Sequence, residues 1–181
     1  MNLKRAFLSI RYFLYFDQMK RADFARKKRI YHHVGDNVRL PASIVPLHSE
    51  LISFHDNIEV ASGVKFIVHD AIHGVLNFKY HGTKNNPQFP EKIDCIEVMD
   101  NVFIGAGTIV LGGVRIGPNV VIGANSLITS DIPEGTVCAG SPARVIGTFD
   151  ELVEKRKKIP PFLSQEDAWE KFYMNKEKSS L

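Results

Sequence analysis

The chain has 181 residues, of which 44% are hydrophobic and 24% charged, as in a soluble globular domain with short terminal extensions. A formal net charge of +3 is too small to indicate a nucleic-acid-binding protein. The two cysteines, Cys95 and Cys138, provide no disulfide framework and favour a reducing, cytoplasmic compartment.

Residues 1–29 are predicted to form an amphipathic helix. Phe7, Ile10 and Leu14 follow one another at three- and four-residue spacing, with Arg and Lys between them. The apolar run FLSIRYFLYF is interrupted by Arg11 and is too short to span a bilayer. Two interpretations remain open. The helix packs against its own domain or a neighbouring subunit, or it makes peripheral contact with an anionic membrane.

A six-residue repeat follows. From Val98 the chain divides into VMDNVF, IGAGTI, VLGGVR, IGPNVV, IGANSL and ITSDIP, and less regular copies begin at Val34, Leu40 and Val60. The first position is Val or Ile in the main block, the fourth is Asn, Gly or Asp, and the fifth is small or β-branched. Neither a helix nor a single strand has this period. Each hexapeptide therefore supplies one short strand and one corner of a parallel β-helix, with the first side chain in the core.

These hexapeptides resemble those of the left-handed β-helix acyltransferases. The stretch GANSLITSDIPEGTVCAGSPARVIG is similar to the closing signature of acetyl-CoA-dependent sugar and xenobiotic O-acetyltransferases. The resemblance implies an all-β fold, a left-handed parallel β-helix over residues 30–147 with three hexapeptides in each coil. The amphipathic helix of residues 1–29 precedes this block. From its own pattern, the tail of residues 148–181 is predicted to form one or two short helices separated by the breaker Pro160-Pro161. The family also implies a homotrimer, in which an extended loop, residues 69–95, covers the active site of a neighbouring subunit.

His69 is the candidate catalytic residue. In the family the catalytic histidine stands at the start of the loop, and the run GVKFIVHD places His69 there. Imidazole, with a pKa of about 6.5, can accept the proton of a hydroxyl that attacks a thioester carbonyl. We expect a carbonyl or carboxylate to hold the other ring nitrogen. His73 is left open, as an acceptor contact, a partner of His69 or a solvated residue. The run HDAIH has Asp70 where a zinc-protease motif needs a longer Glu, so no metal is expected.

The resemblance also implies acetyl-CoA in a groove between two subunits. Ala106 and Ala124 match the small residues whose backbone contacts the pantetheine arm. Thr129 and Ser130 match a Thr-Lys pair at the nucleotide end, although Ser130 lacks the charge of the usual Lys. Arg144 matches the basic residue that contacts the phosphates, a role that suits a guanidinium.

The sequence therefore predicts an acetyl-CoA-dependent O-acetyltransferase acting on a sugar hydroxyl, in the biosynthesis of a surface polysaccharide or a related glycan. Two alternatives remain. One is N-acetylation of an amino sugar nucleotide, and the other is a non-catalytic β-helix scaffold. Thiol release from acetyl-CoA distinguishes the enzymes from the scaffold.

Overall fold

The computed structural model describes residues 3–81, 88–159 and 164–178 and divides into two compact units, Met1–Phe149 and Asp150–Leu181. In the first unit, the described strands form three sheets whose neighbours are parallel except for one antiparallel pair at the end. The first sheet holds β1 (His33–Val34), β2 (Ile52–Phe54), β5 (Ile96–Val98) and β8 (Val114–Ile116). The second holds β3 (Ile58–Val60), β6 (Val102–Ile104), β9 (Val120–Ile122), β11 (Thr136–Gly140) and β12 (Ala143–Thr148). The third holds β4 (Lys65–Ile67), β7 (Ile109–Leu111) and β10 (Leu127–Ile128).

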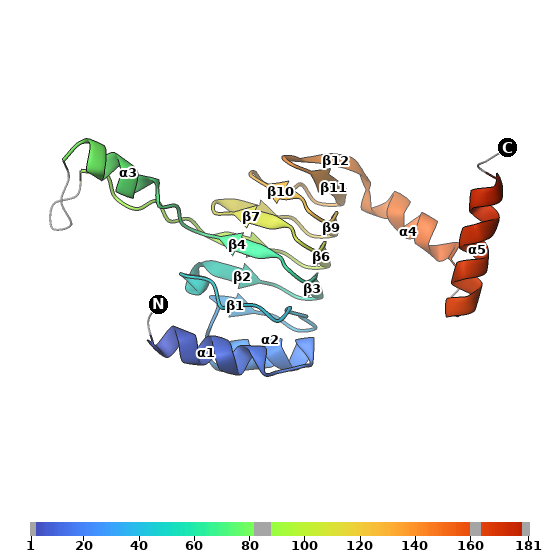
Figure 1. Ribbon diagram of the computed structural model, residues 1–181, viewed down its shortest axis with the longest axis horizontal. Helices are drawn as coiled ribbons and strands as arrows, with labels where there is room; N and C mark the ends of the chain where they lie inside the picture. Colours follow the sequence, from blue (N-terminus) through green and yellow to red (C-terminus); the bar gives the residue numbers. More distant parts are fainter. Residues whose placement is uncertain (1–2, 82–87, 160–163, 179–181) are drawn as a thin grey trace. The chain divides into compact units, whose positions relative to one another are not determined.

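The strand register confirms that three hexapeptides make one coil. Ile96 pairs with Val114, Val102 with Val120, and Ile109 with Leu127, so equivalent residues in successive coils are 18 positions apart. The chain visits the three sheets in turn and returns to the first one coil higher. Figure 1 shows the resulting stack, with β1 at one end and β11 and β12 at the other.

The repeat positions form the core. All six first-position side chains of the main block have no exposed surface: Val98, Ile104, Val110, Ile116, Ile122 and Ile128. The fifth-position side chains are also buried, at 8% exposure or less: Val102, Thr108, Val114, Val120, Ser126 and Ile132. A three-residue strand buries little alone, so stacking and this continuous aliphatic column stabilise one another.

The corners explain the choice of residue at the fourth position. Five of the six have a positive φ between 55° and 85°, which Asn and Gly tolerate best: Asn101, Gly107, Gly113, Asn119 and Asn125. At one corner the asparagines also form a ladder, in which Asn37, Asn57, Asn101 and Asn119 are linked by amide hydrogen bonds of 3.0 Å.

The early coils differ from the predicted frame at one hexapeptide. In LPASIV, Leu40 is buried but the fifth residue, Ile44, is 70% exposed, and Val45 enters the core instead. A complete hexapeptide, FHDNIE, was missed because Phe54 replaces the usual aliphatic residue. Phe54 and Ile58 are buried, and Asn57 has a φ of 58°, as the repeat requires.

The N-terminal segment forms two helices rather than one. They are α1 (Leu3–Phe13) and α2 (Gln18–Lys27), and both lie at the end of the stack next to β1 (Figure 1). Asp17 begins α2, since its carboxylate accepts a hydrogen bond from the backbone N–H of Lys20 at 2.8 Å. Tyr12 of α1 and Phe24 of α2 are buried in the core of the first unit.

Three more helices lie outside the repeats. The predicted loop contains α3 (Ile72–Lys79), and the C-terminal segment forms α4 (Phe149–Lys157) and α5 (Gln165–Lys178), as its pattern predicted. The predicted break at Pro160 and Pro161 lies outside the described residues. None of the helices in the described ranges is both long and apolar enough to cross a membrane.

Candidate active site

His69 lies just beyond the end of β4, where the loop leaves the stack. The first and last residues of the loop pair antiparallel here, in what we call the loop crossing. The Asp70 N–H donates to the Lys92 carbonyl at 3.1 Å, and the Asp94 N–H donates to the Val68 carbonyl at 2.8 Å. Gly112 permits this crossing. A Cβ at that position would lie 3.0 Å from the Cβ of Asp94 and 3.3 Å from the Cα of Val68. The site is therefore built where the first and last residues of the loop meet the coil.

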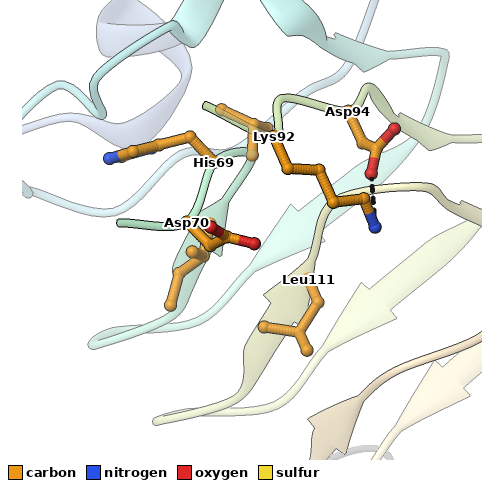
Figure 2. A pocket seen from close by; sticks show the side chains of 8 residues that line it. His69, Asp70, Lys92, Asp94 and Leu111 are labelled. Atoms are coloured by element: carbon orange, nitrogen blue, oxygen red, sulfur yellow. Dashed lines mark ion pairs between the residues drawn. The ribbon is translucent and has the colours of Figure 1, made fainter. Parts of the chain in front are cut away.

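A cavity of about 150 Å³ opens beside this crossing. Lys92 forms an ion pair with Asp94 at 3.0 Å, and the hydrogen bond to Asp94 raises the pKa of Lys92. Figure 2 shows the ammonium group of Lys92 at the carboxylate of Asp94, with the carboxylate of Asp70 farther away, while the imidazole of His69 points in another direction. His69 is therefore one of the residues that line this cavity, although its ring is turned away from the Lys92–Asp94 ion pair.

The His69 ring packs instead against a second histidine. The ring centroids of His48 and His69 are 5.6 Å apart and the rings are nearly perpendicular, at 75°. The Nδ1 of His48 lies 3.4 Å from a carboxylate oxygen of Glu50, and the backbone of His48 has a left-handed φ of 56°. The Nδ1 of His69 is buried without a hydrogen-bond partner among the described residues. The carbonyl or carboxylate expected to hold this nitrogen is thus missing from the described part of a single chain.

His73 lies in the first turn of α3. Its Nδ1 is also buried without a hydrogen-bond partner in the described ranges, and no contact there joins it to His69. Two buried, unpaired imidazole nitrogens so close in sequence are unusual, because a buried polar atom normally has a partner. Each of these two nitrogens therefore lacks, within the described chain, the partner that a buried polar atom normally has.

The predicted cofactor residues separate into two groups. Ala106 lies between β6 and β7, and Ala124 lies between β9 and β10, one coil higher on the same edge of the stack. Both are exposed, and among the residues described here neither backbone N–H donates to a protein acceptor. Gly105 allows the two coils to approach closely at this edge, since a Cβ there would come within 2.5 Å of the Ala124 nitrogen. This edge thus presents two free amides in successive coils.

Arg144 lies at the top of the same edge. It pairs with Ala139 in the β11–β12 hairpin, and Ala139 lies directly above Gly123, the neighbour of Ala124. Its side chain is exposed, and one guanidinium nitrogen donates to the Ala143 carbonyl at 2.8 Å. The guanidinium of Arg144 therefore lies on the same edge as the free amides of Ala106 and Ala124, at the upper end of the stack.

Thr129 and Ser130 lie on the other edge of the third sheet. They follow the end of β10, as His69 follows the end of β4, whereas Ala124 precedes β10. At about 3.3 Å per residue, a strand of two or three residues holds these edges roughly 10 Å apart. Within one chain, His69, Thr129 and Ser130 therefore lie on one edge of the third sheet. Ala106, Ala124 and Arg144, which we call the Ala-Ala-Arg line, lie on the other edge.

Sequence reasoning missed His48, Lys92 and Asp94. His48 lies on an irregular segment before β2, and the other two lie at the far end of the loop, so only the fold brings them to His69. No group of three or more His, Cys, Asp or Glu side chains in the described part of the chain is arranged to hold a metal ion.

Comparisons with known proteins agree with this architecture. Residues 96–130 match the family described as bacterial transferase hexapeptide (six repeats). A stretch of 70 residues is 39% identical to a 2,3,4,5-tetrahydropyridine-2,6-dicarboxylate N-acetyltransferase of Staphylococcus aureus, and covers 39% of this chain and 29% of that protein. The chain therefore matches less than a third of the length of this curated relative.

Solved structures share the fold over more of the chain. A maltose O-acetyltransferase from Clostridium difficile is 25% identical, with a TM-score of 0.56, over 81% of this chain and 84% of that one. A galactoside acetyltransferase in complex with coenzyme A is 23% identical, with a TM-score of 0.56, over 90% and 85%. The hexapeptide match implies the left-handed winding predicted from the sequence. Residues 96–130 are thus hexapeptide repeats of the bacterial transferase type, within a fold that solved acetyltransferases share.

Proposed function

We propose that the protein transfers an acetyl group from acetyl-CoA to a hydroxyl of a sugar, in a surface polysaccharide or related glycan, with His69 as general base. The observation that carries the proposal is the half-buried imidazole of His69, whose Nδ1 has no hydrogen-bond partner among the described residues, at the edge of a transferase-type repeat block. The likeness to a maltose O-acetyltransferase supports a sugar hydroxyl as acceptor. The coenzyme A bound by the galactoside acetyltransferase supports the donor.

The chemistry follows from the properties of an alcohol and a thioester. The acceptor oxygen attacks the thioester carbonyl while the imidazole of His69 takes its proton. The tetrahedral intermediate then collapses, the carbon–sulfur bond breaks, and the imidazolium returns the proton to the departing thiolate. The products are the acetyl ester and coenzyme A with a free thiol.

The free amides of Ala106 and Ala124 suit the amide and carbonyl groups of a pantetheine arm. Each can donate one hydrogen bond without breaking a bond within the described protein. The exposed guanidinium of Arg144 would then meet the phosphates at the top of the same edge. Thr129 and Ser130 would meet the nucleotide from the opposite side of the groove.

The separation of these groups supports a homotrimer. One chain holds the base on one edge and the Ala-Ala-Arg line on another, so a groove lined by both requires the edges of two copies. Three copies around a threefold axis would bring each edge of one copy to the other edge of the next, which gives three equivalent sites. We place the protein in the cytoplasm, where acetyl-CoA is available.

A second candidate is acetyl transfer to an amino group. The identity of 39% with an N-acetyltransferase over 70 residues favours it. A neutral amine needs the same base and the same donor, so the described site fits either acceptor.

Thiol release from acetyl-CoA, measured across a panel of sugars, nucleotide sugars, amino sugars and amino acids, tests the proposal. We expect release that depends on a neutral sugar bearing only hydroxyls. Release with amino acceptors alone would establish the second candidate. A properly folded protein that releases no thiol with any acceptor would support a scaffold.

A further inference from the structure

Helix α1 presents apolar side chains on two opposite sides. Leu8 and Tyr12 pack against the core of the first unit, and Tyr12 has no exposed surface. Phe7, Ile10 and Leu14 are 62%, 60% and 63% exposed. At about 100° per residue, Phe7 and Ile10 fall on the side of the helix opposite Leu8 and Tyr12, and Leu14, one residue beyond the end of α1, continues that side. The exposed stripe therefore takes no part in holding α1 to the domain.

The turn after α1 extends this stripe. Phe16 is 97% exposed, and Met19, at the start of α2, is 43% exposed. A phenylalanine that is almost entirely in water gains nothing from its place in the folded chain. Figure 1 shows α1 and α2 together at the end of the stack, so no coil lies beyond them.

Positive charge is concentrated in the same segment. Residues 1–29 carry nine Lys or Arg and two Asp, a net charge of +7, whereas the whole chain carries +3, so the remainder carries −4. Of the two acids, Asp17 caps α2 and Asp23 pairs with Arg26 at 3.0 Å. Lys20 and the run 27–29 are exposed and form no ion pair among the described residues. This layer therefore combines exposed aromatic side chains with unpaired cations.

We infer that the surface formed by α1, the turn at Phe16 and the basic end of α2 binds an anionic lipid membrane. An amphipathic helix at a membrane surface inserts its apolar side among the lipid chains, while nearby cations contact the anionic headgroups. A second copy docked face to face would instead bring the exposed cations of two such segments together, Lys20 and residues 27–29 of each, which is unfavourable. The inference does not depend on the proposed transfer reaction.

Sedimentation of the full-length protein with vesicles tests the inference. We expect binding to vesicles of phosphatidylcholine with 30% phosphatidylglycerol, and little binding to phosphatidylcholine alone. Phe7→Ser/Ile10→Ser/Phe16→Ser should weaken this binding at least tenfold. Since each nearby cation contributes roughly fivefold in affinity, Lys27→Glu/Lys28→Glu should have a similar or larger effect.

A matched control removes equally exposed aromatic side chains elsewhere. Trp169→Ser/Tyr173→Ser changes two residues of α5 that are 60% and 59% exposed, and should leave vesicle binding unchanged. Circular dichroism checks that each variant is folded. If the triple serine variant is not folded, the charge-reversal variant Lys27→Glu/Lys28→Glu tests the inference instead.

Three results would overturn the inference. The first is a wild-type protein that stays in solution with anionic vesicles. The second is binding by the folded triple serine variant that equals wild type, or an equal loss in the α5 control. The third is light scattering in which the serine variant forms a smaller oligomer than wild type, since the exposed stripe would then belong to a contact between copies.

Discussion

The ring of His48 stands nearly perpendicular to the ring of His69, with their centroids 5.6 Å apart. A carboxylate oxygen of Glu50 lies 3.4 Å from the Nδ1 of His48, and the backbone of His48 is left-handed. A ring that packs edge-on limits the rotation of its neighbour. Because the Nδ1 of His69 has no hydrogen-bond partner among the described residues, the packing of His48 against the ring helps to fix the orientation of the imidazole.

His69→Ala should lower kcat by roughly 10²–10⁴-fold, because the acceptor hydroxyl loses the group that takes its proton. The KM for acetyl-CoA should change little, since the free amides lie on the other edge. Steady-state kinetics with both substrates measures this. His73→Ala serves as the comparison, and should act mainly on the KM of the acceptor or have no effect. Near-normal kcat for His69→Ala with a collapse for His73→Ala would assign the base to His73.

His48→Ala should lower kcat by up to about tenfold, because an aromatic pair contributes about 0.5–1.5 kcal/mol and its loss frees the His69 ring. His48→Phe keeps a ring at this position and should restore most of the activity. The pH–rate profile separates positioning from simple loss of fold. It should keep its shape in His48→Phe. Equal losses in the two variants would show that the ring at position 48 has no positioning role.

The repeat architecture could be predicted because it depends on local periodicity. Val98 and its equivalents at every sixth residue are buried, and Asn101 and its equivalents occupy left-handed corners, as the pattern requires. FHDNIE does not fit a pattern defined by aliphatic first positions, although Phe54 is fully buried and packs against the rings of Tyr31 and Phe66. The two-helix start was also missed, because the apolar spacing continues across the break that Asp17 creates.

A site residue could be predicted only where its position relative to the repeats identifies it. His69 stands at the end of a repeat, and its position follows from counting along the chain. Its neighbours His48 and Asp94 come from distant segments, and only the crossing of the loop over Gly112 brings Asp94 close. The division of the cofactor residues between two edges likewise depends on the order of the sheets, which the sequence does not specify residue by residue.

Arg144→Ala should raise the KM for acetyl-CoA by an amount equivalent to about 1.5–3 kcal/mol, as expected for loss of a charge-assisted hydrogen bond. The kcat and the melting temperature should remain near wild type, since the side chain is exposed. Arg39→Ala is a suitable control, because Arg39 is also exposed but pairs with Glu59 at 3.4 Å in a lower coil. Unchanged affinity for acetyl-CoA in Arg144→Ala would remove Arg144 from the cofactor groove.

Glu97 should make stability depend on pH in acid. The guanidinium of Arg115, 2.7 Å away, and then the ring of His55 lower the pKa of this carboxyl below its usual 4.5. A lowered native pKa gives stability that is present above the unfolded value and lost as pH falls through the native value. Glu97→Gln should therefore lower the melting temperature by about 2–4 °C at pH 7, the shift for about 1 kcal/mol after solvent screening.

The difference between Glu97→Gln and wild type should shrink as pH falls below about 4.5, and vanish once Glu97 is protonated in wild type. Calorimetry from pH 3 to pH 7 measures it. Glu59→Gln is the control, because its ion pair with Arg39 is longer, at 3.4 Å, and about half exposed. A difference that stays constant over this pH range would show that the ionised carboxylate contributes nothing.

Mixed oligomers test whether two copies share each site. His69→Ala removes the base, and Ala124→Trp fills the groove at an exposed corner, so each variant alone should be nearly inactive. In a random mixture, a site that takes its base from one copy and its groove from the next is intact when an Ala124→Trp copy supplies His69 and a His69→Ala copy supplies Ala124. Threefold symmetry then predicts recovery of about a quarter of wild-type activity after the two variants are unfolded and refolded together. If base and groove came from the same chain, every site would carry one defect and the mixture would stay as inactive as its parts.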